Sequence, residues 1–148
     1  MENHPYLKDA LLISKYDYLE SLETFREGLF VVQDISSMLV GELAHVQAGA
    51  QVIDLCAAPG GKALDVAERI LMEGQAGCSG HVEARDLTEY KVSLIEENIE
   101  RMGLCNVTAV CQDASVYDEK SAGKADIVIA DLPCSGLGVL GKKTDLKI

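Results

Sequence analysis

The sequence predicts an α/β domain built around a parallel sheet. From residue 51 onward, strand and helix signals alternate along the chain. The helical segments repeat apolar residues every three or four positions, and the strand segments are short apolar runs. Of the 148 residues 48% are hydrophobic, which is enough for a buried core. Parallel strands need right-handed crossovers, and such sheets bind ligands beyond the carboxyl ends of their strands.

The first fifty residues give weaker signals than the rest. Residues 29–33 are an apolar run that fits a strand entering the domain, and residues 36–47 fit a helix that either Asp34 or Ser36 could cap. Residues 1–28 show no clear periodicity. We expect them to be an N-terminal arm or the remnant of a preceding domain, with the main domain in residues 29–148.

The remaining elements follow one another closely. Strands are predicted at residues 51–56, 80–84, 106–111 and 125–133, and helices at residues 62–74 and 87–103. Thr88 is suited to cap the second helix and Gly103 to end it. The chain stops soon after the fourth strand, so an edge of the parallel sheet would be uncovered. We therefore expect a fragment, or a sheet completed by a partner or by self-association through the bare edge.

Charge and cysteine content exclude several classes of protein. The net charge of −11 gives no overall basic surface, so a polyanion would need a local cluster or parts of a longer protein. No apolar run or N-terminal pattern indicates a membrane span or signal peptide, and we expect a cytoplasmic protein. The five cysteines include no CxxC pair, which argues against disulfides and a metal site. Cys78, Cys105 and Cys111 are expected to be buried free thiols.

A glycine-rich stretch, DLCAAPGGK at residues 54–62, follows the first strand of the alternating region. It lacks the GxxxxGK[ST] spacing of a phosphate-binding loop, because Cys56 and Ala63 stand where Gly and Ser or Thr are needed. No GxGxxG pattern is present either. The small residues would let a ligand approach the backbone, and the helix start favours a carboxylate or other anion. The alternative is a tight turn that binds nothing.

Acidic residues end the next two strands. Asp86 lies 25 residues after Gly61, near the spacing at which an acid reaches ribose hydroxyls in nucleotide-binding units. Asp113 could accept from an adenine amino group or simply cap a turn. Arg85 is placed to screen Asp86, and Lys91 is expected on the solvated helix face. That face also carries Glu89, Glu96, Glu97 and Glu100.

A second unusual stretch, DLPCSG at residues 131–136, ends the last predicted strand. Pro133 makes a rigid platform for the thiol of Cys134, which could add to an electron-poor ring carbon or assist a proton transfer. A simple buried cysteine is the alternative.

Five features together resemble the Sun/Fmu-type RNA cytosine-5 methyltransferases. They are VQDISSML at 32–39, DLCAAPGGK at 54–62, Asp86, Asp113 and DLPCSGLG at 131–138. The likeness is greatest to the bacterial group that acts on small-subunit ribosomal RNA, and it covers about residues 18–148. It implies a Rossmann-like S-adenosylmethionine-dependent methyltransferase fold whose C-terminal strands are missing here, with residues 29–148 as a partial catalytic domain.

The resemblance also implies roles for single residues. Asp86 would hold the ribose of S-adenosylmethionine, Asp113 would contact its adenine, and Asp131 would lie beside the methyl donor and the target base. Cys134 would help to release the methylated product and would not be the primary nucleophile. The loop around the methionine part of the cofactor would consist of Cys56, Ala57, Ala58, Pro59, Gly60, Gly61 and Lys62.

The chemistry of this family calls for two thiols. Carbon 5 of cytosine is a weak nucleophile until a thiolate adds to carbon 6 of a base splayed out of its stack. In the family that thiolate comes from a Thr-Cys segment, and these 148 residues contain no Thr-Cys. We therefore expect the chain to be inactive alone, and the family's upstream RNA-binding domain to be missing or reduced to residues 1–28.

Two other functions remain open. An amino-group methyltransferase is disfavoured, because such enzymes generally present an aromatic residue after Pro-Pro where this chain has Leu132-Pro133-Cys134-Ser135. A module that binds S-adenosylmethionine or a protein without performing chemistry is the alternative from a different class.

Overall fold

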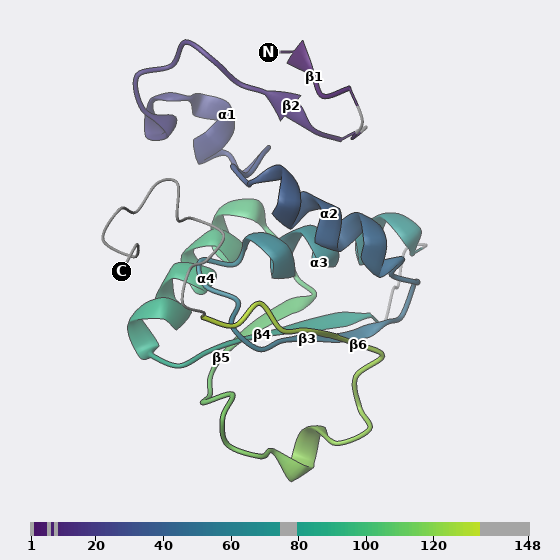
Figure 1. Cartoon of the computed structure of the whole chain (residues 1–148). Helices are drawn as coiled ribbons and strands as arrows, with labels where there is room; N and C mark the ends of the chain where they lie inside the picture. The colour runs from purple at the N-terminus through teal and green to yellow at the C-terminus, as the bar shows by residue number, and fades with distance from the viewer. Residues whose placement is uncertain (1, 6, 8, 75–79, 134–148) are drawn as a thin grey trace, which may run out of the picture.

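A four-stranded parallel sheet forms the centre of the protein. The computed structural model describes residues 2–5, 7, 9–74 and 80–133. The strands are β3 (Gln51–Asp54), β4 (His81–Asp86), β5 (Val107–Cys111) and β6 (Ile127–Ile129), in the order β5-β4-β3-β6. Helices α3 and α4 cover one face of this sheet, α2 packs against α3 on the same side, and the loop between β5 and β6 runs over the other face (Figure 1). The predicted parallel α/β architecture is confirmed.

Strand β3 lies between β4 and β6 and pairs with both. Val52 of β3 pairs in register with Val82 of β4 on one side and with Ile127 of β6 on the other. Strand β6 is much shorter than the predicted 125–133. Asp126 pairs with the start of β3, its N–H donating to the Gln51 carbonyl at 2.8 Å. Beyond Ile129 the chain leaves the sheet, which brings the following residues to the cavity described below.

Helix α3 (Gly61–Glu73) supplies the largest part of the core. Five of its side chains are buried against the sheet, in agreement with the predicted helical spacing: Ala63, Leu64, Val66, Ala67 and Ile70. Asn106, at the start of β5, donates its side-chain N–H to the Ala67 carbonyl at 2.9 Å, which fixes the helix against the strand.

Helix α4 (Glu89–Met102) begins and ends as predicted. The Thr88 hydroxyl accepts from the Lys91 N–H, and Gly103 ends the helix in the left-handed conformation, with φ of 65°. Its apolar side buries Val92 and Ile95. The four glutamates assigned to its solvated face are all exposed.

Helix α2 (Ile35–Ala44) is preceded by a segment that is not a strand. Asp34 takes the N-cap position, although its side chain makes no capping bond within the described part of the chain. The strand predicted at 29–33 is wrong, because this apolar run lies beyond the sheet and pairs with none of its strands. Instead the Phe30 carbonyl accepts from Nη1 of Arg101 at 3.2 Å.

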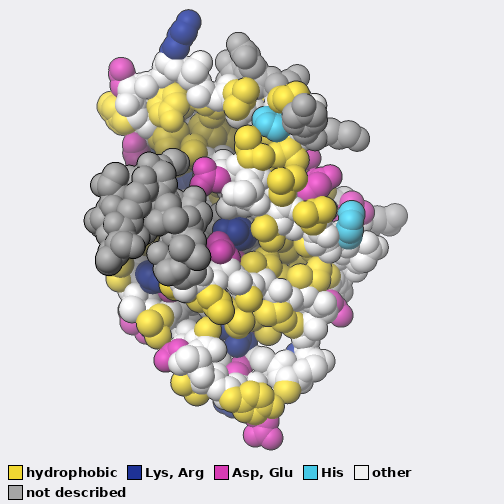
Figure 2. Space-filling model, viewed as in Figure 1, with side chains coloured by type: hydrophobic (Ala, Val, Ile, Leu, Met, Phe, Trp, Pro, Cys, Tyr) yellow, Lys and Arg dark blue, Asp and Glu magenta, His cyan; other side chains and the backbone are white. Residues whose placement is uncertain are grey.

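The N-terminal arm lies apart from the main sheet (Figure 1). It contains the short antiparallel pair β1 (Glu2–Asn3) and β2 (Leu11–Leu12), the single turn η1 (Leu19–Ser21) and α1 (Glu23–Arg26). Figure 2 shows hydrophobic atoms gathered over this arm, where exposed apolar side chains include Leu11, Leu12, Tyr16 and Tyr18.

One arginine of α4 holds the end of the arm. The Arg101 guanidinium stacks 4.3 Å from the centroid of the Phe25 ring and donates to the Phe25 carbonyl at 2.9 Å. The Phe25 and Phe30 rings lie 5.6 Å apart. Arg101 thus contacts both sides of the predicted division between residues 28 and 29, which stays a prediction.

Candidate functional site

A cavity of about 490 Å³ opens at the carboxyl ends of β3, β4 and β6. Its walls come from four separate parts of the sequence: the segment before α2, the β3–α3 loop, the start of α4 and the residues after β6. The lining residues include Gln33, Asp54, Cys56, Ala57, Ala58, Pro59, Gly61, Lys62, Asp86, Lys91, Asp131 and Pro133. Most of the side chains selected from the sequence therefore meet at one place.

The β3–α3 loop follows the edge of the sheet. The Ala57 N–H donates to the Arg85 carbonyl at 2.8 Å, which ties the loop to the neighbouring strand. Gly60 has φ of 113°, a conformation that favours glycine, and its N–H donates to the Ala57 carbonyl at 2.7 Å. Because Gly60 is also the N-cap residue of α3, the first turn of this helix receives no side-chain cap from it.

Asp86 lies in the wall of the cavity with three donors around its carboxylate. The side chain is 2% exposed, and it accepts from the Ala58 N–H at 3.0 Å, the Leu87 N–H at 2.8 Å and Lys91 Nζ at 2.9 Å. Burial alone would raise the pKa of this carboxyl, but Lys91 and the two backbone donors outweigh it and lower the pKa below 3.8. Asp86 is therefore a fixed carboxylate at neutral pH.

Lys91 was expected on the solvated face of α4, and that expectation is wrong. Its ammonium group turns toward the sheet and pairs with Asp86, and it lines the cavity. The two residues are five positions apart, across the junction of strand and helix. A lysine in the first turn of a helix that starts directly after a buried acid is the signal that could have identified the pair.

An ion pair joins the two long sequence motifs. Lys62 Nζ lies 2.6 Å from Asp131 Oδ2, with side-chain exposures of 22% and 62%. Such an exposed pair contributes little to stability. The pair is informative about geometry, because it shows that the segment after β6 lies beside the start of α3 and that the Asp131 carboxylate belongs to the cavity lining.

Asp54 is a cavity residue that sequence reasoning did not select. It ends β3, is 1% exposed, and accepts from the Cys56 N–H at 3.3 Å. Burial raises its pKa from 3.8 to about 6, against the opposing effect of the Cys56 N–H and Lys62. An acid at the end of a buried central strand was the available signal.

Cys56 lines the cavity as a partly buried thiol. Burial, followed by the charges of Asp86 and Asp54, raises the pKa of this thiol above 9.0, so it stays protonated at neutral pH. This fits a loop residue better than a nucleophile. Cys105 and Cys111 are exposed, so the prediction that they are buried is wrong, and Cys78 and Cys134 lie outside the described residues.

Asp113 follows β5 but does not belong to the described lining of this cavity. Its carboxylate accepts from the Ser115 N–H at 2.8 Å and from the Ser115 hydroxyl at 2.7 Å, which lowers its pKa. This is the turn-capping role that the sequence left open. Contact with adenine stays a prediction.

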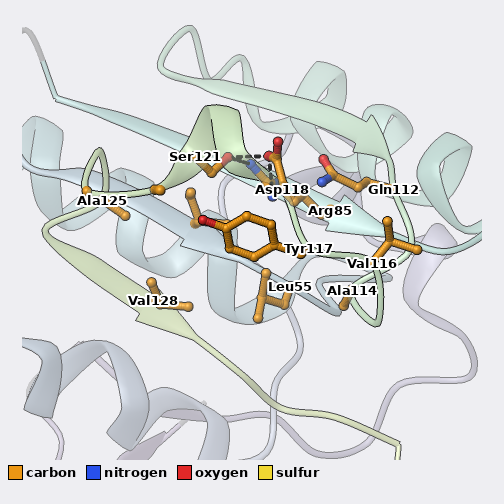
Figure 3. Close-up of a pocket in the computed structure, with 13 residues that line it drawn as sticks. Leu55, Arg85, Gln112, Ala114, Val116, Tyr117, Asp118, Ser121, Ala125 and Val128 are labelled. Carbon is orange, nitrogen blue, oxygen red and sulfur yellow. Dashed lines mark hydrogen bonds and ion pairs between the residues drawn. The ribbon is translucent and has the colours of Figure 1, made fainter.

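Arg85 does not screen Asp86, contrary to expectation. Successive side chains of a strand point to opposite faces, and Arg85 lies on the face away from the helices, paired with Glu83 and Asp118. It borders a second cavity of about 330 Å³ under the β5–β6 loop. Figure 3 shows the Tyr117 ring beside Leu55 in this cavity, with Arg85, Asp118 and Ser121 joined by hydrogen bonds and ion pairs.

Neither a metal cluster nor a membrane-crossing helix is found in the described ranges. No three His, Cys, Asp or Glu side chains there are grouped closely enough to hold an ion. The helices in those ranges are also too short or too polar to span a bilayer.

Comparisons with known proteins agree on the class of this chain. The family described as "16S rRNA methyltransferase RsmB/F" matches residues 42–148. The chain is 40% identical over 124 residues to "Probable ribosomal RNA small subunit methyltransferase B" of Bacillus subtilis, covering 83% of this chain and 26% of that protein. It thus spans about a quarter of that relative's length.

Solved structures show the same relationship. The crystal structure of PH0851 superposes with a TM-score of 0.83 and 27% identity, covering 99% of this chain and 32% of that one. NSun6 from Pyrococcus horikoshii, solved with SFG, gives a TM-score of 0.67 and 30% identity over 81% of this chain and 29% of that one. The fold is therefore that of the Rossmann-like methyltransferases, which use S-adenosylmethionine as the methyl donor.

The cavity suits that cofactor chemically. S-adenosylmethionine offers ribose hydroxyls that need acceptors, an ammonium group that needs a carboxylate, and a carboxylate that needs donors. Asp86 is a fixed carboxylate at the end of β4, and Asp54 is a buried one at the end of β3. The α3 start, where Gly60 provides no side chain, supplies backbone donors beside Lys62.

Proposed function

Because the chain belongs to the 16S rRNA methyltransferase RsmB/F family, we propose that it carries the S-adenosylmethionine site of an enzyme that methylates carbon 5 of cytosine in small-subunit ribosomal RNA. The observation that supports this most strongly is the Lys62–Asp131 pair of 2.6 Å. It joins the glycine-rich loop to the Pro-Cys segment, so cofactor binding and base chemistry meet at one cavity.

The proposed roles follow the geometry of the cavity. Residues 56–62 surround the methionine part of the cofactor, and Asp86 accepts from the ribose hydroxyls with its orientation fixed by Lys91. Asp131, held by Lys62, faces the methyl donor and the target base. Asp113 is proposed for the adenine side, after release from its turn with Ser115.

The proposed reaction uses two thiols. A thiolate adds to carbon 6 of cytosine, carbon 5 then takes the methyl group, the proton on carbon 5 leaves to a base, and elimination of the thiolate restores the ring. Cys134 assists the release step. The adding thiol belongs to a Thr-Cys segment, and since these 148 residues contain none, we propose that they transfer no methyl group by themselves.

The remaining proposals concern the whole protein. Small-subunit ribosomal RNA is its partner, and its place of action is the cytoplasm. The net charge of −11 supports a division of labour in which other parts of the protein grip the RNA. Residues 1–28 are an N-terminal arm or the remnant of a preceding domain, and residues 29–148 are part of the catalytic domain.

A trapping experiment tests this function. In the longer protein that contains this segment, Cys134→Ser should slow release and accumulate a covalent RNA–protein adduct that survives denaturing electrophoresis. Cys105→Ser, at an exposed thiol, is the control and should accumulate none. Absence of the adduct in Cys134→Ser, with substrate RNA and S-adenosylmethionine present, would refute the proposed role. Methyl transfer by the 148 residues alone would refute the claim that they lack the nucleophile.

A further inference from the structure

A glutamine amide nitrogen in the wall of the cavity has no hydrogen-bond partner among the described residues. The Nε2 atom of Gln33 is buried, and among the described residues it donates no hydrogen bond. Gln33 lines the cavity from the segment that precedes α2. A buried donor without an acceptor costs free energy, so a position of this kind suggests that an acceptor arrives with a ligand.

The amide lies over the first turn of α3. A Cβ atom built on Gly61 would stand 3.7 Å from Cγ, Cδ and Nε2 of Gln33. The same turn carries the backbone N–H groups that Gly60 leaves without a side-chain cap. Gln33 and the start of α3 therefore lie together in the lining of the cavity, to which Lys62 also belongs.

The lining of the cavity carries both hydrogen-bond donors and acids. The Gln33 side chain lies beside the start of α3, where the helix dipole favours a negative group. Asp54 and Asp131 form acidic positions on the same cavity. An α-amino acid zwitterion matches these groups, since its carboxylate needs donors and its ammonium group needs an acid.

We propose that Gln33 binds the carboxylate of the methionine part of S-adenosylmethionine, and so selects a cofactor that carries an intact amino-acid end. This inference rests on the proposed function, since it assigns one further residue to that site. The hydrogen bond joins a neutral amide donor to an ionised acceptor, which is the stronger class of hydrogen bond.

The test compares two ligands that differ only in this group. S-adenosylmethionine and decarboxylated S-adenosylmethionine are titrated calorimetrically into the chain and into its Gln33→Leu variant. The variant should bind S-adenosylmethionine about 10- to 100-fold more weakly, as expected for loss of a hydrogen bond to a charged group. Its affinity for the decarboxylated ligand should not change, because that ligand has no carboxylate to lose.

Two further variants sharpen the comparison. Gln33→Glu places a negative charge beside the carboxylate and should weaken S-adenosylmethionine binding more than Gln33→Leu does. Gln47→Leu is the control, since the Gln47 amide is exposed and donates to the His45 carbonyl. Gln33→Leu should not lower the Tm of the free chain, because it removes a buried donor that has no described partner.

The outcomes separate the two claims. Equal weakening of both ligands by Gln33→Leu, or weakening of neither, overturns the inference and leaves the S-adenosylmethionine site in place. Failure of the unaltered chain to bind either ligand overturns the proposed function and the inference with it.

Discussion

Replacement of Asp54 by Asn should stabilise the protein, and by an amount that depends on pH. Asp54 is 1% exposed, and burial raises its pKa from 3.8 to about 6. At neutral pH the folded protein therefore holds a charge that the interior disfavours. Asn has the same shape and is neutral at every pH, and it keeps an oxygen that can accept from the Cys56 N–H.

The sign and size follow from proton linkage. Between pH 4 and 6 the folded state binds more protons at Asp54 than the unfolded state, so the stability of the unaltered protein falls as pH rises through this range. One unit of difference between the folded and unfolded pKa corresponds to about 1.4 kcal/mol, so the charged form of Asp54 costs up to about 3 kcal/mol above pH 6. Asp54→Asn should recover up to that amount at pH 8 and almost nothing at pH 4.

Urea unfolding at pH 4 and at pH 8 measures this difference. Asp113→Asn is a control whose effect on stability should have the opposite sign. Hydrogen bonds from Ser115 lower the Asp113 pKa, so removing this carboxylate should reduce stability at pH 8. The reasoning about Asp54 is refuted if Asp54→Asn changes the free energy of unfolding by the same amount at pH 4 and at pH 8.

Two further predictions concern the backbone and the Asp86 site. Replacing a left-handed glycine by alanine costs about 1 kcal/mol where the new Cβ meets nothing. Gly28→Ala should reduce the free energy of unfolding by well over this amount, because its Cβ would collide with the Arg101 carbonyl. Gly103→Ala is the control in urea unfolding and should show only the smaller cost, because φ is also positive there but nothing lies within 4 Å. Equal losses in the two variants would contradict the packing of the arm. Lys91→Met should raise the pKa of Asp86, measured by carboxyl NMR titration, because the ammonium group is the main factor that lowers it. An unchanged pKa would show that the backbone donors suffice.

Local patterns allowed most of the fold to be predicted. Helix α4 has apolar residues on one side, a capping Thr88 and a terminating Gly103, and all three signals agree. Residues 29–33 show where this reasoning fails. Leu29 and Val32 are exposed, and the Phe30 carbonyl accepts from Arg101 instead of a neighbouring strand. A strand needs a partner that no local pattern reveals.

The candidate site was predictable where a topological rule applied. The carboxyl ends of parallel strands meet at one edge, so the loop after β3 and Asp86 could be placed together from the sequence. Lys91 was predicted to lie on the solvated face of α4 because the glutamates near it were predicted to lie there. Its side chain instead reaches back across the helix start to Asp86. The buried Nε2 atom of Gln33, which has no partner in the described part of the chain, depends on packing between α2 and α3, which sequence spacing does not encode.

Direct titration of S-adenosylmethionine into the 148-residue chain tests the central claim, that these residues form a methyl-donor site around Asp86 and the Lys62–Asp131 pair. Calorimetry on the folded chain should give a saturable heat with one ligand bound per chain at micromolar ligand concentrations. A folded chain that gives no heat with S-adenosylmethionine in the high micromolar range would contradict the account.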